Sequence, residues 1–317
     1  MAWLTCLILF FIQIGEKYLD YYGSPSELLE IVHNLNNRIG NISSDVCDIT
    51  HPSEIKLLLI TDSLEYLYNL SDPGGNFKID TSFKKGGYLI FTRPTITYKG
   101  MMASYPVVKG LPCIVIGTPQ NTGLTMDQWV LTILHEHFHL LQMNLPGYFE
   151  GVDALNLSGG DESGMWMLNY DFPYNEPEIS RSLKKLGNLI ADCIKEKGDC
   201  ATEVSEVLID LKHQLSPKDF SYMEFQLWQE GIARFIEYEY ACYLSESEFK
   251  VHGAQSNFTE LATGKYKAGI NYLRNINSEE NKREVFYDLG WGIRMILKNQ
   301  DNSWQENYWR NRFKILN

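Results

Sequence analysis

The sequence has no excess of positive charge. Its 28 Lys and Arg residues are outnumbered by 40 Asp and Glu residues, and the net charge is -12. Because nucleic-acid phosphates are bound by clustered basic side chains, this balance argues against a nucleic-acid partner. The same negative field disfavours an anionic membrane surface. Since 44% of the residues are hydrophobic, the composition is that of a folded chain and not of a disordered one.

Several motifs of known chemistry are also missing. The chain has no G-x-S-x-G, P-loop or G-x-G-x-x-G pattern, so serine-hydrolase, nucleotide and dinucleotide functions lack support. Its six cysteines form no paired C-x-x-C motifs, which argues against a cysteine zinc site. Cys193 and Cys200 flank a short polar stretch with a glycine turn signal. They could close a disulfide loop in an exported protein or remain two free thiols, and the sequence leaves both open.

Long apolar runs are absent apart from one short segment near the start. Leu4–Ile14 is apolar over about eleven residues, which is too short to span a membrane but typical of a secretory signal. No Lys or Arg precedes this run, and no small-x-small cleavage site follows it. We interpret residues 1–15 as a possible signal peptide or, alternatively, an N-terminal apolar helix. The expected location is periplasmic, secreted or cell-surface, with the cytoplasm as the alternative.

The two halves of the chain differ in their hydrophobic pattern. Short strand-like runs and helices are mixed in the first half, whereas the pattern after Glu176 is almost wholly helical to about residue 298. A loop rich in Gly, Asp and aromatic residues is expected at 157–175. The pattern predicts an amphipathic helix at 24–40, ended by Gly40, strands at 57–62, 88–93 and 112–119, and a helix at 125–143.

This organisation predicts an α+β fold with a small mixed sheet in the first half and helices in the second. No linker rich in Pro, Gly or Ser separates the parts. We therefore expect a single domain over residues 16–317, with a sheet-containing part at about 16–147 and a helical part at about 148–317.

The helix expected at 125–143 carries an H-E-x-x-H motif. Thr125 and Gln128 can form a capping box at its start. His135 and His139 lie one turn apart, about 40° apart around the helix, so both imidazoles can reach one metal ion. Glu136 is about 100° from His135 and can act as a general base for metal-bound water without being a ligand.

His137 lies inside the same motif but is expected to be structural. On a regular helix it is about 200° from His135, within the apolar arc of the helix. That position excludes His137 as a third metal ligand. We expect a buried histidine with one hydrogen bond.

A third ligand is expected from a second helix at 225–244. Glu230 stands among aromatic and aliphatic residues and is followed by Gly231, which permits close backbone approach. The alternative for Glu230 is a solvated ion-pair face, because Arg234 and Glu237 share its stripe. Glu237 could orient a metal-ligating histidine, or simply pair with Arg234.

Two further aromatic segments are candidates for the site. Tyr287, in the helix expected near 286–297, could donate a hydrogen bond to a developing oxyanion, or be a packed aromatic side chain. Arg234 is a weaker candidate for the same donor role. The loop with Asp161, Trp166, Tyr170 and Tyr174 could line a cleft or be an ordered surface loop.

These motifs resemble the gluzincin metallopeptidases. In that family two histidines of H-E-x-x-H and a downstream Glu, often in an E-G-x-A helix, bind zinc. By this resemblance the zinc ligands here are His135, His139 and Glu230, the last of which begins an E-G-x-A sequence that ends at Ala233. The resemblance covers about 40 residues and implies a zincin-like fold. The chain departs from the thermolysin pattern, because His139 and Glu230 are 91 residues apart and Arg234 replaces an expected Asp.

The sequence therefore predicts a zinc-dependent metallopeptidase. Zinc held by His135, His139 and Glu230 would bind a water molecule that Glu136 activates for attack on a peptide bond. The expected cofactor is one catalytic Zn²⁺, and the expected partner is a peptide or protein substrate. The alternatives are a zinc hydrolase of another amide or ester, and a catalytically inactive peptidase-like binding protein.

Overall fold

The structure is a computed structural model that describes residues 23–47, 53–86, 88–247, 249, 256–298 and 304–314. The apolar run Leu4–Ile14 and the possible signal peptide at 1–15 lie outside the described residues. Among the helices that are described, none combines the length and the apolar character needed to cross a membrane.

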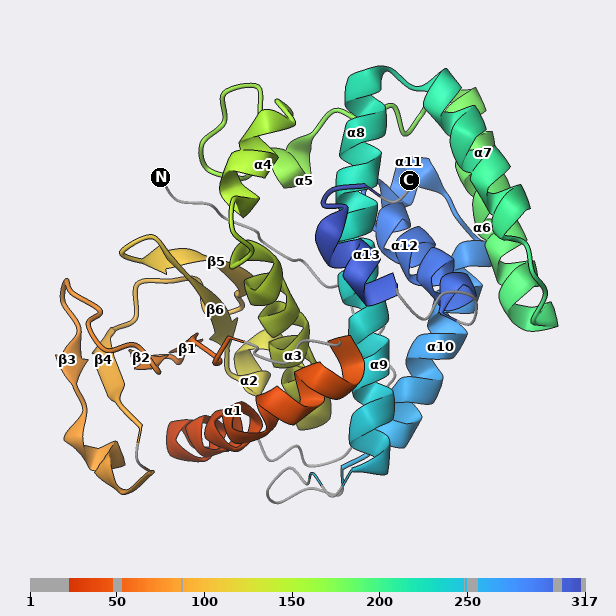
Figure 1. Cartoon of the computed structure of the whole chain (residues 1–317). Helices are drawn as coiled ribbons and strands as arrows, with labels where there is room; N and C mark the ends of the chain where they lie inside the picture. Colours follow the sequence, from red (N-terminus) through yellow and green to blue (C-terminus); the bar gives the residue numbers. More distant parts are fainter. Residues whose placement is uncertain are drawn as a thin grey trace. The chain divides into compact units, whose positions relative to one another are not determined.

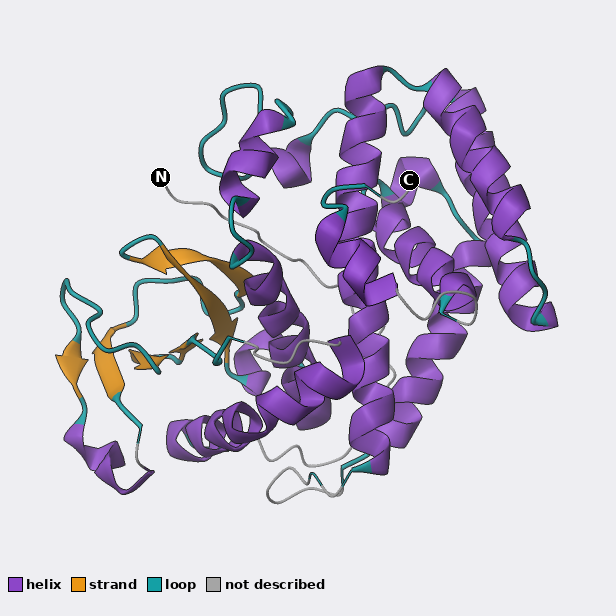
Figure 2. Cartoon of the chain, in the orientation of Figure 1, coloured by secondary structure: helices purple, strands orange, loops and turns teal. Residues whose placement is uncertain are grey.

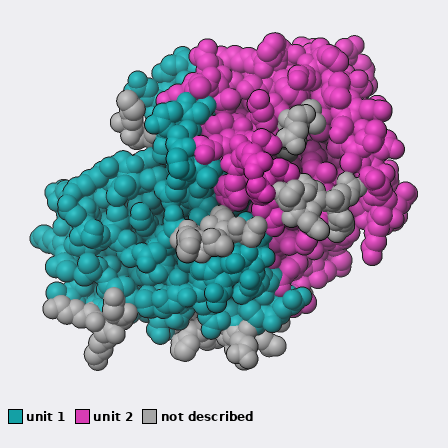
Figure 3. All heavy atoms as spheres, in the orientation of Figure 1, with its two compact units in different colours: residues 1–151, 158–168, 243–258 teal, residues 152–157, 169–242, 259–317 magenta. Residues whose placement is uncertain are grey.

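The chain divides into two compact units (Figure 3). Unit 1 contains residues 1–151, 158–168 and 243–258, and unit 2 contains residues 152–157, 169–242 and 259–317. The single domain expected for residues 16–317 remains a prediction, since compact units of this kind occur within one domain as well as in separate ones.

The fold is mixed α+β, with the strands in the first half of the chain and a helical second half (Figures 1 and 2). The strands are β1 Leu57–Ile60, β2 Leu64–Tyr68, β3 Lys78–Ile79, β4 Ile90–Pro94, β5 Met102–Val108 and β6 Leu111–Gly117. The helices of the first half are α1 Pro25–Cys47, the 3₁₀ segment Thr81–Gly86, α2 Pro119–Thr122, α3 Met126–Met143 and α4 Tyr148–Ala154. The later helices are α5 Trp166–Asn169, α6 Pro177–Glu196, α7 Ala201–Gln214, α8 Pro217–Gln226, the π-helical segment η2 Leu227–Gly231, α9 Ile232–Glu246, α10 Phe258–Arg274, α11 Ser278–Asn281, α12 Glu284–Leu297 and α13 Trp304–Arg310.

The six strands form one sheet in the order β3-β4-β2-β1-β6-β5. Strands β1 and β6 are parallel, and every other pair is antiparallel. All four residues of the central strand β1 are buried, which explains its continuous Leu-Leu-Leu-Ile sequence. Helix α3, which carries the H-E-x-x-H motif, packs on β5 and β6, the two strands at one edge of the sheet (Figure 1).

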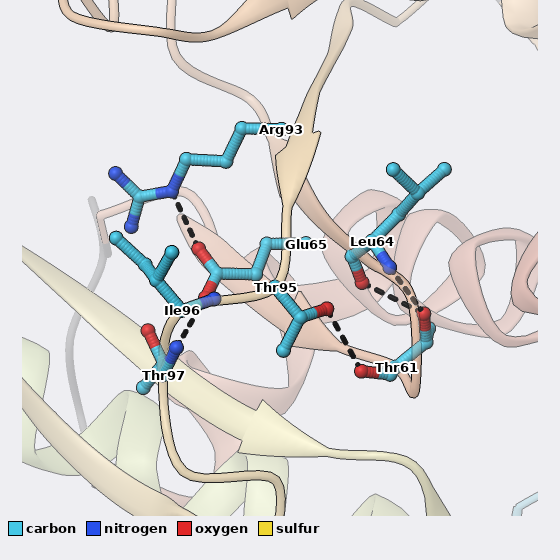
Figure 4. A network of polar contacts seen from close by, with 7 residues as sticks. All are labelled: Thr61, Leu64, Glu65, Arg93, Thr95, Ile96 and Thr97. Atoms are coloured by element: carbon cyan, nitrogen blue, oxygen red, sulfur yellow. Dashed lines mark hydrogen bonds and ion pairs between the residues drawn. The ribbon is translucent and has the colours of Figure 1, made fainter.

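A buried carboxylate organises the turn after β4 (Figure 4). Glu65 of β2 is fully buried and accepts hydrogen bonds from Arg93 Nε at 2.6 Å, Ile96 N at 2.9 Å and Thr97 N at 2.7 Å. Burial alone would raise the pKa of Glu65, but these hydrogen bonds outweigh it and lower the pKa. The carboxylate therefore stays ionised and fixes this loop.

Two expected boundaries are wrong. Helix α1 does not end at Gly40 but continues to Cys47, because Ile42, Ser43 and Val46 extend its buried face. The segment 157–175 is not all loop, because it includes the short helix α5, whose first amide, at Trp166, donates to Asp161 Oδ2 at 2.7 Å.

Two glycines let unit 2 pack closely. A Cβ atom on Gly231 of η2 would lie 2.6 Å from the Cα of Gly290 in α12, and the reverse contact would be 2.5 Å. No residue larger than glycine fits such a backbone crossing without displacement. Helix α12 therefore lies directly against the segment that carries Glu230.

The turn between α6 and α7 is closed covalently. Cys193 and Cys200 form a disulfide across seven positions of sequence. Of the two possibilities that the sequence left open for this pair, the structure has the bonded one.

Candidate metal centre

Helix α3 is held against the sheet by hydrogen bonds that do not involve the metal-ligand group. Thr125 and Gln128 form the expected capping box, with Thr125 N donating to Gln128 Oε1 at 2.9 Å. Trp129 Nε1 donates to the Gly117 carbonyl at 2.8 Å. Ser104 Oγ of β5 donates to the Glu136 carbonyl at 2.9 Å, within the motif itself. These contacts tie the motif to strands β5 and β6.

The two histidines of the motif face one another. The Nε2 atoms of His135 and His139 are 3.1 Å apart, and both side chains are buried. Two nitrogens that ligate one tetrahedral zinc ion at 2.0–2.1 Å are roughly 3.3 Å apart. The imidazole pair is therefore arranged as a divalent metal requires.

Gln142 orients one of these imidazoles. Its Oε1 atom accepts a hydrogen bond from His139 Nδ1 at 2.6 Å, and the Gln142 side chain is fully buried. Because an amide oxygen only accepts, the proton is placed on Nδ1, and Nε2 keeps the lone pair that a metal needs. Gln142 was not predicted from the sequence, although its spacing of three positions from His139 places both on one helix face.

Replacement of Gln142 by leucine is expected to weaken zinc binding about 10- to 100-fold, since the imidazole loses the partner that sets its tautomer. Competition with a chromophoric chelator measures the affinity. Gln142→Glu keeps an acceptor and should retain most of the zinc affinity. Gln214→Leu, at an exposed position in α7, should leave the zinc affinity unchanged. Equal affinities for Gln142→Leu and the unaltered protein would contradict this role.

His137 has the structural role expected for it. Its Nε2 atom donates to the Ser53 carbonyl at 2.7 Å. Complete burial lowers the pKa of His137 to about 4, so the imidazole is neutral at physiological pH. It contributes to packing and not to the metal-ligand group.

Glu230 lies in a π-helical segment that interrupts the α8–α9 helix. The Ile232 amide donates to the carbonyl of Leu227, five residues earlier, instead of four. Such a turn adds one residue and rotates the following side chains relative to a regular helix, and it is frequent at functional sites. Glu230 is 2% exposed, so the solvated ion-pair face considered as its alternative is wrong.

The structure brings the three expected ligands together. Among the described residues, ligand atoms of His135, His139 and Glu230 all lie within 4.8 Å of one another. All three side chains are buried. Two imidazoles and one carboxylate are a donor set that suits zinc, and this group can hold a metal ion.

Two guanidinium groups flank Tyr287 beside Glu230. The guanidinium carbons of Arg234 and Arg283 each lie 5.4 Å from the Tyr287 ring centroid. Arg283 Nη1 is 4.0 Å from Glu230 Oε1. Burial, together with the Glu230 charge, raises the pKa of Tyr287 well above 10 against the opposing effect of Arg283. The Tyr287 hydroxyl therefore stays protonated, as the predicted oxyanion donor must. Arg283 was not among the residues predicted from the sequence.

Glu237 has a lysine partner. Lys265 Nζ of α10 donates to Glu237 Oε1 at 2.6 Å, and the carboxylate is 1% exposed. Although burial lowers the pKa of Arg234, the charge of Glu237 raises it; the ion pair that Glu237 forms, however, is with Lys265. The other expectation, that Glu237 orients a metal-ligating histidine, remains a prediction.

Asp288 of α12 is expected to make stability depend on pH. Burial raises its pKa from 3.8 to about 7, with Glu284 adding to this effect and Arg234 opposing it. The folded state therefore binds the proton more tightly, so the free energy of unfolding should fall between about pH 4 and pH 7. After allowance for partial solvent screening, the loss should be about 2 kcal/mol. Urea unfolding at pH 5 and pH 8 measures it.

Asp288→Asn should flatten this pH dependence, because the amide does not titrate. Asp210→Asn, at an exposed position in α7, should leave it unchanged. A pH profile of Asp288→Asn that follows the unaltered protein would rule out Asp288 as the source.

The aromatic loop is held by hydrogen bonds and ring packing. Asp161 accepts hydrogen bonds from Ser163 and Trp166, and the Tyr170 hydroxyl donates to Asp219 at 2.9 Å. These residues stabilise the loop itself. Burial raises the pKa of Tyr174, whose ring packs against Phe172 and Phe286 at centroid distances of 4.7 and 6.0 Å.

Comparison with known proteins gives no match. No family model, no curated protein and no solved structure matches this chain.

Proposed function

We propose that this chain is a zinc-dependent metallopeptidase of gluzincin type with a zincin-like fold. The observation that carries the proposal is the buried group of His135, His139 and Glu230, whose ligand atoms lie within 4.8 Å of one another. Three protein ligands of this kind are typical of catalytic zinc, because a structural site has four. The buried H-E-x-x-H helix beside a mixed sheet, followed by a helical half, supports the family proposal.

The reaction assigns a distinct task to each side chain. A zinc ion in this site would supply Lewis acidity that polarises a substrate carbonyl and makes water more acidic. Glu136 takes a proton from the attacking water as its oxygen bonds to the carbonyl carbon. Glu136 then gives that proton to the amine nitrogen as the C–N bond breaks, so atoms and charges balance.

Other residues hold the reacting groups in place. The Tyr287 hydroxyl donates a hydrogen bond to the oxyanion that forms on the former carbonyl oxygen. Gln142 holds His139 in the ligating tautomer. The hydrogen bond from Ser104 to the Glu136 carbonyl fixes the backbone of the general base.

Metal analysis combined with a substrate panel tests the proposal. Purified protein should contain one zinc per chain and cleave members of a peptide library, and Glu136→Gln should slow the cleavage by about 10²- to 10⁴-fold. Turnover confined to small amides or esters would indicate another hydrolase. Stoichiometric zinc without any turnover would indicate a binding protein, and absence of metal would leave the motif a coincidence.

We also propose that the protein works outside the reducing cytoplasm, and the Cys193–Cys200 disulfide supports this. Protein from its own source, alkylated during lysis, should show two fewer reactive thiols than the same protein after reduction. An unchanged thiol count would contradict export to an oxidising compartment.

A further inference from the structure

The π turn that carries Glu230 changes the hydrogen bonding of one backbone carbonyl. In a regular α-helix the Ile232 amide would donate to the carbonyl of Trp228, four residues earlier. Here that amide donates to the Leu227 carbonyl instead. Because a buried carbonyl is costly to leave without a hydrogen bond, the Trp228 carbonyl requires a donor from elsewhere in the fold.

Helix α13 supplies such a donor. The Tyr308 hydroxyl, 80 positions further along the chain, donates to the Trp228 carbonyl at 3.2 Å. In return, Trp228 Nε1 donates to the Tyr308 carbonyl at 3.3 Å. Both residues are buried. Helix α13 therefore meets the helix formed by α8, η2 and α9 at the π turn, through two reciprocal hydrogen bonds (Figure 1).

Aromatic packing reinforces this junction. The Trp228 and Tyr308 rings stack with their centroids 4.9 Å apart and an angle of 17° between their planes. The Phe313 ring lies 5.0 Å from that of Trp228 and 5.8 Å from that of Phe225 in α8. Phe313 has a φ of 58°, which is unfavourable for a bulky residue. The ring packing offsets this conformation and holds the chain after α13 against the π turn.

The π turn determines the direction of the Glu230 side chain. Successive residues of a regular helix are rotated by about 100°, so relaxation of the turn to regular geometry would rotate side chains by roughly that angle. Such a rotation would turn Glu230 away from His135 and His139, whose ligand atoms now lie within 4.8 Å of its own. The geometry of the metal-ligand group therefore depends on the π turn.

Two contacts within unit 2 hold this turn. Helix α12 contacts its end, where Gly231 crosses Gly290. Helix α13 contacts its start, where Tyr308 bonds to Trp228. The glycine crossing restrains the turn by shape alone, whereas the Tyr308 hydroxyl satisfies the carbonyl whose usual partner the turn has removed.

We propose that Tyr308 is a positioning residue for the metal centre, because its hydroxyl holds the π turn in the form that directs Glu230 toward His135 and His139. This proposal rests on the proposed metallopeptidase function, in which Glu230 is a metal ligand. Tyr308 acts through the backbone of Trp228, in the way that residues behind a ligand fix its orientation.

Replacement of Tyr308 by phenylalanine in the full chain tests this role, because it removes the hydroxyl and keeps the stacked ring. Competition with a chromophoric chelator should show a zinc affinity about tenfold lower, the lower end of the effect expected for a residue that supports a ligand. Cobalt(II) in place of zinc gives a spectroscopic readout. Its visible absorption depends on ligand positions, so the bands of Tyr308→Phe should shift or change in intensity.

Tyr68→Phe is the matched control for a loss of stability. Tyr68 of β2 is also buried, and its hydroxyl lies 3.1 Å from His33 Nδ1, so this variant also removes a hydrogen-bonded hydroxyl. Both variants should lower the thermal stability of the metal-free protein. Only Tyr308→Phe should change the zinc affinity and the cobalt spectrum.

A double variant tests whether Tyr308 acts through Glu230. In a Glu230→Gln protein, Tyr308→Phe should cause no further loss of zinc affinity, because no ligand remains for it to position. A full, additive loss in that background would overturn the proposal.

Unchanged zinc affinity and an unchanged cobalt spectrum in folded Tyr308→Phe would also overturn it, as would equal losses of affinity in Tyr308→Phe and Tyr68→Phe. If Tyr308→Phe does not fold, Phe313→Leu loosens the same junction and should lower the affinity in the same direction. Unchanged affinity in that variant would then overturn the proposal. Failure of the metallopeptidase proposal is distinct, because the unaltered protein itself would then bind no zinc.

Discussion

Replacement of Glu136 by glutamine is expected to lower kcat for peptide hydrolysis by about 10²- to 10⁴-fold, the usual contribution of a positioned general base. Glutamine has nearly the same shape, but its amide cannot accept the proton of the attacking water. The side chain is fully buried on a helix that Ser104 and Trp129 anchor to the sheet, so the replacement should not displace the helix. Stopped assays at saturating peptide concentration measure kcat.

The zinc content is the essential control for this variant. Because Glu136 is not an expected ligand, Glu136→Gln should hold as much zinc as the unaltered protein. Glu150→Gln, at an exposed position in α4, should change neither zinc content nor kcat. Full activity in Glu136→Gln would remove Glu136 as the base, and loss of zinc would make it a ligand instead.

Replacement of Glu230 is expected to cause the largest loss of metal. Removal of a residue that only orients a ligand costs 10- to 100-fold in metal affinity, so removal of the ligand itself should cost more than about 100-fold. Both Glu230→Ala and Glu230→Gln should show this loss, and glutamine keeps the volume of the buried side chain. Metal content after dialysis against a weak chelator measures the effect.

Two comparisons separate metal binding from stability. Glu239→Ala removes a carboxylate from α9 that pairs with Lys298 at 2.6 Å, and it should leave zinc content unchanged. Thermal unfolding of metal-free Glu230→Gln shows whether the variant still folds. Stoichiometric zinc in a folded Glu230→Gln protein would exclude Glu230 as a ligand and reopen the search for the third one.

The local sequence pattern was sufficient to predict the helix that carries the H-E-x-x-H motif. The capping box at Thr125, the one-turn spacing of His135 and His139, and the structural place of His137 all depend on neighbours within a few residues. Helical periodicity determines such relations wherever a helix forms. The division into a sheet-containing half and a helical half followed from the same kind of pattern.

Strand prediction was less complete. The strands β1, β4 and β6 were expected, but β2, β3 and β5 were not. Strand β5 contains Pro106 beside a register shift, which weakens its local signal, and β3 has only two residues. A strand is stabilised by partners far away in the sequence, so these three became evident only from the pairing of the sheet.

The surroundings of Glu230 depend on packing between distant segments. A π turn at Leu227–Gly231, a backbone crossing at Gly231 and Gly290, and the contact with Arg283 leave no periodic trace in the sequence. Residue order alone established which side chains share a face of α3. The meeting of those imidazoles with a carboxylate 91 residues beyond His139 required the folded chain, because the free energy that holds it there comes from long-range packing and not from local preference.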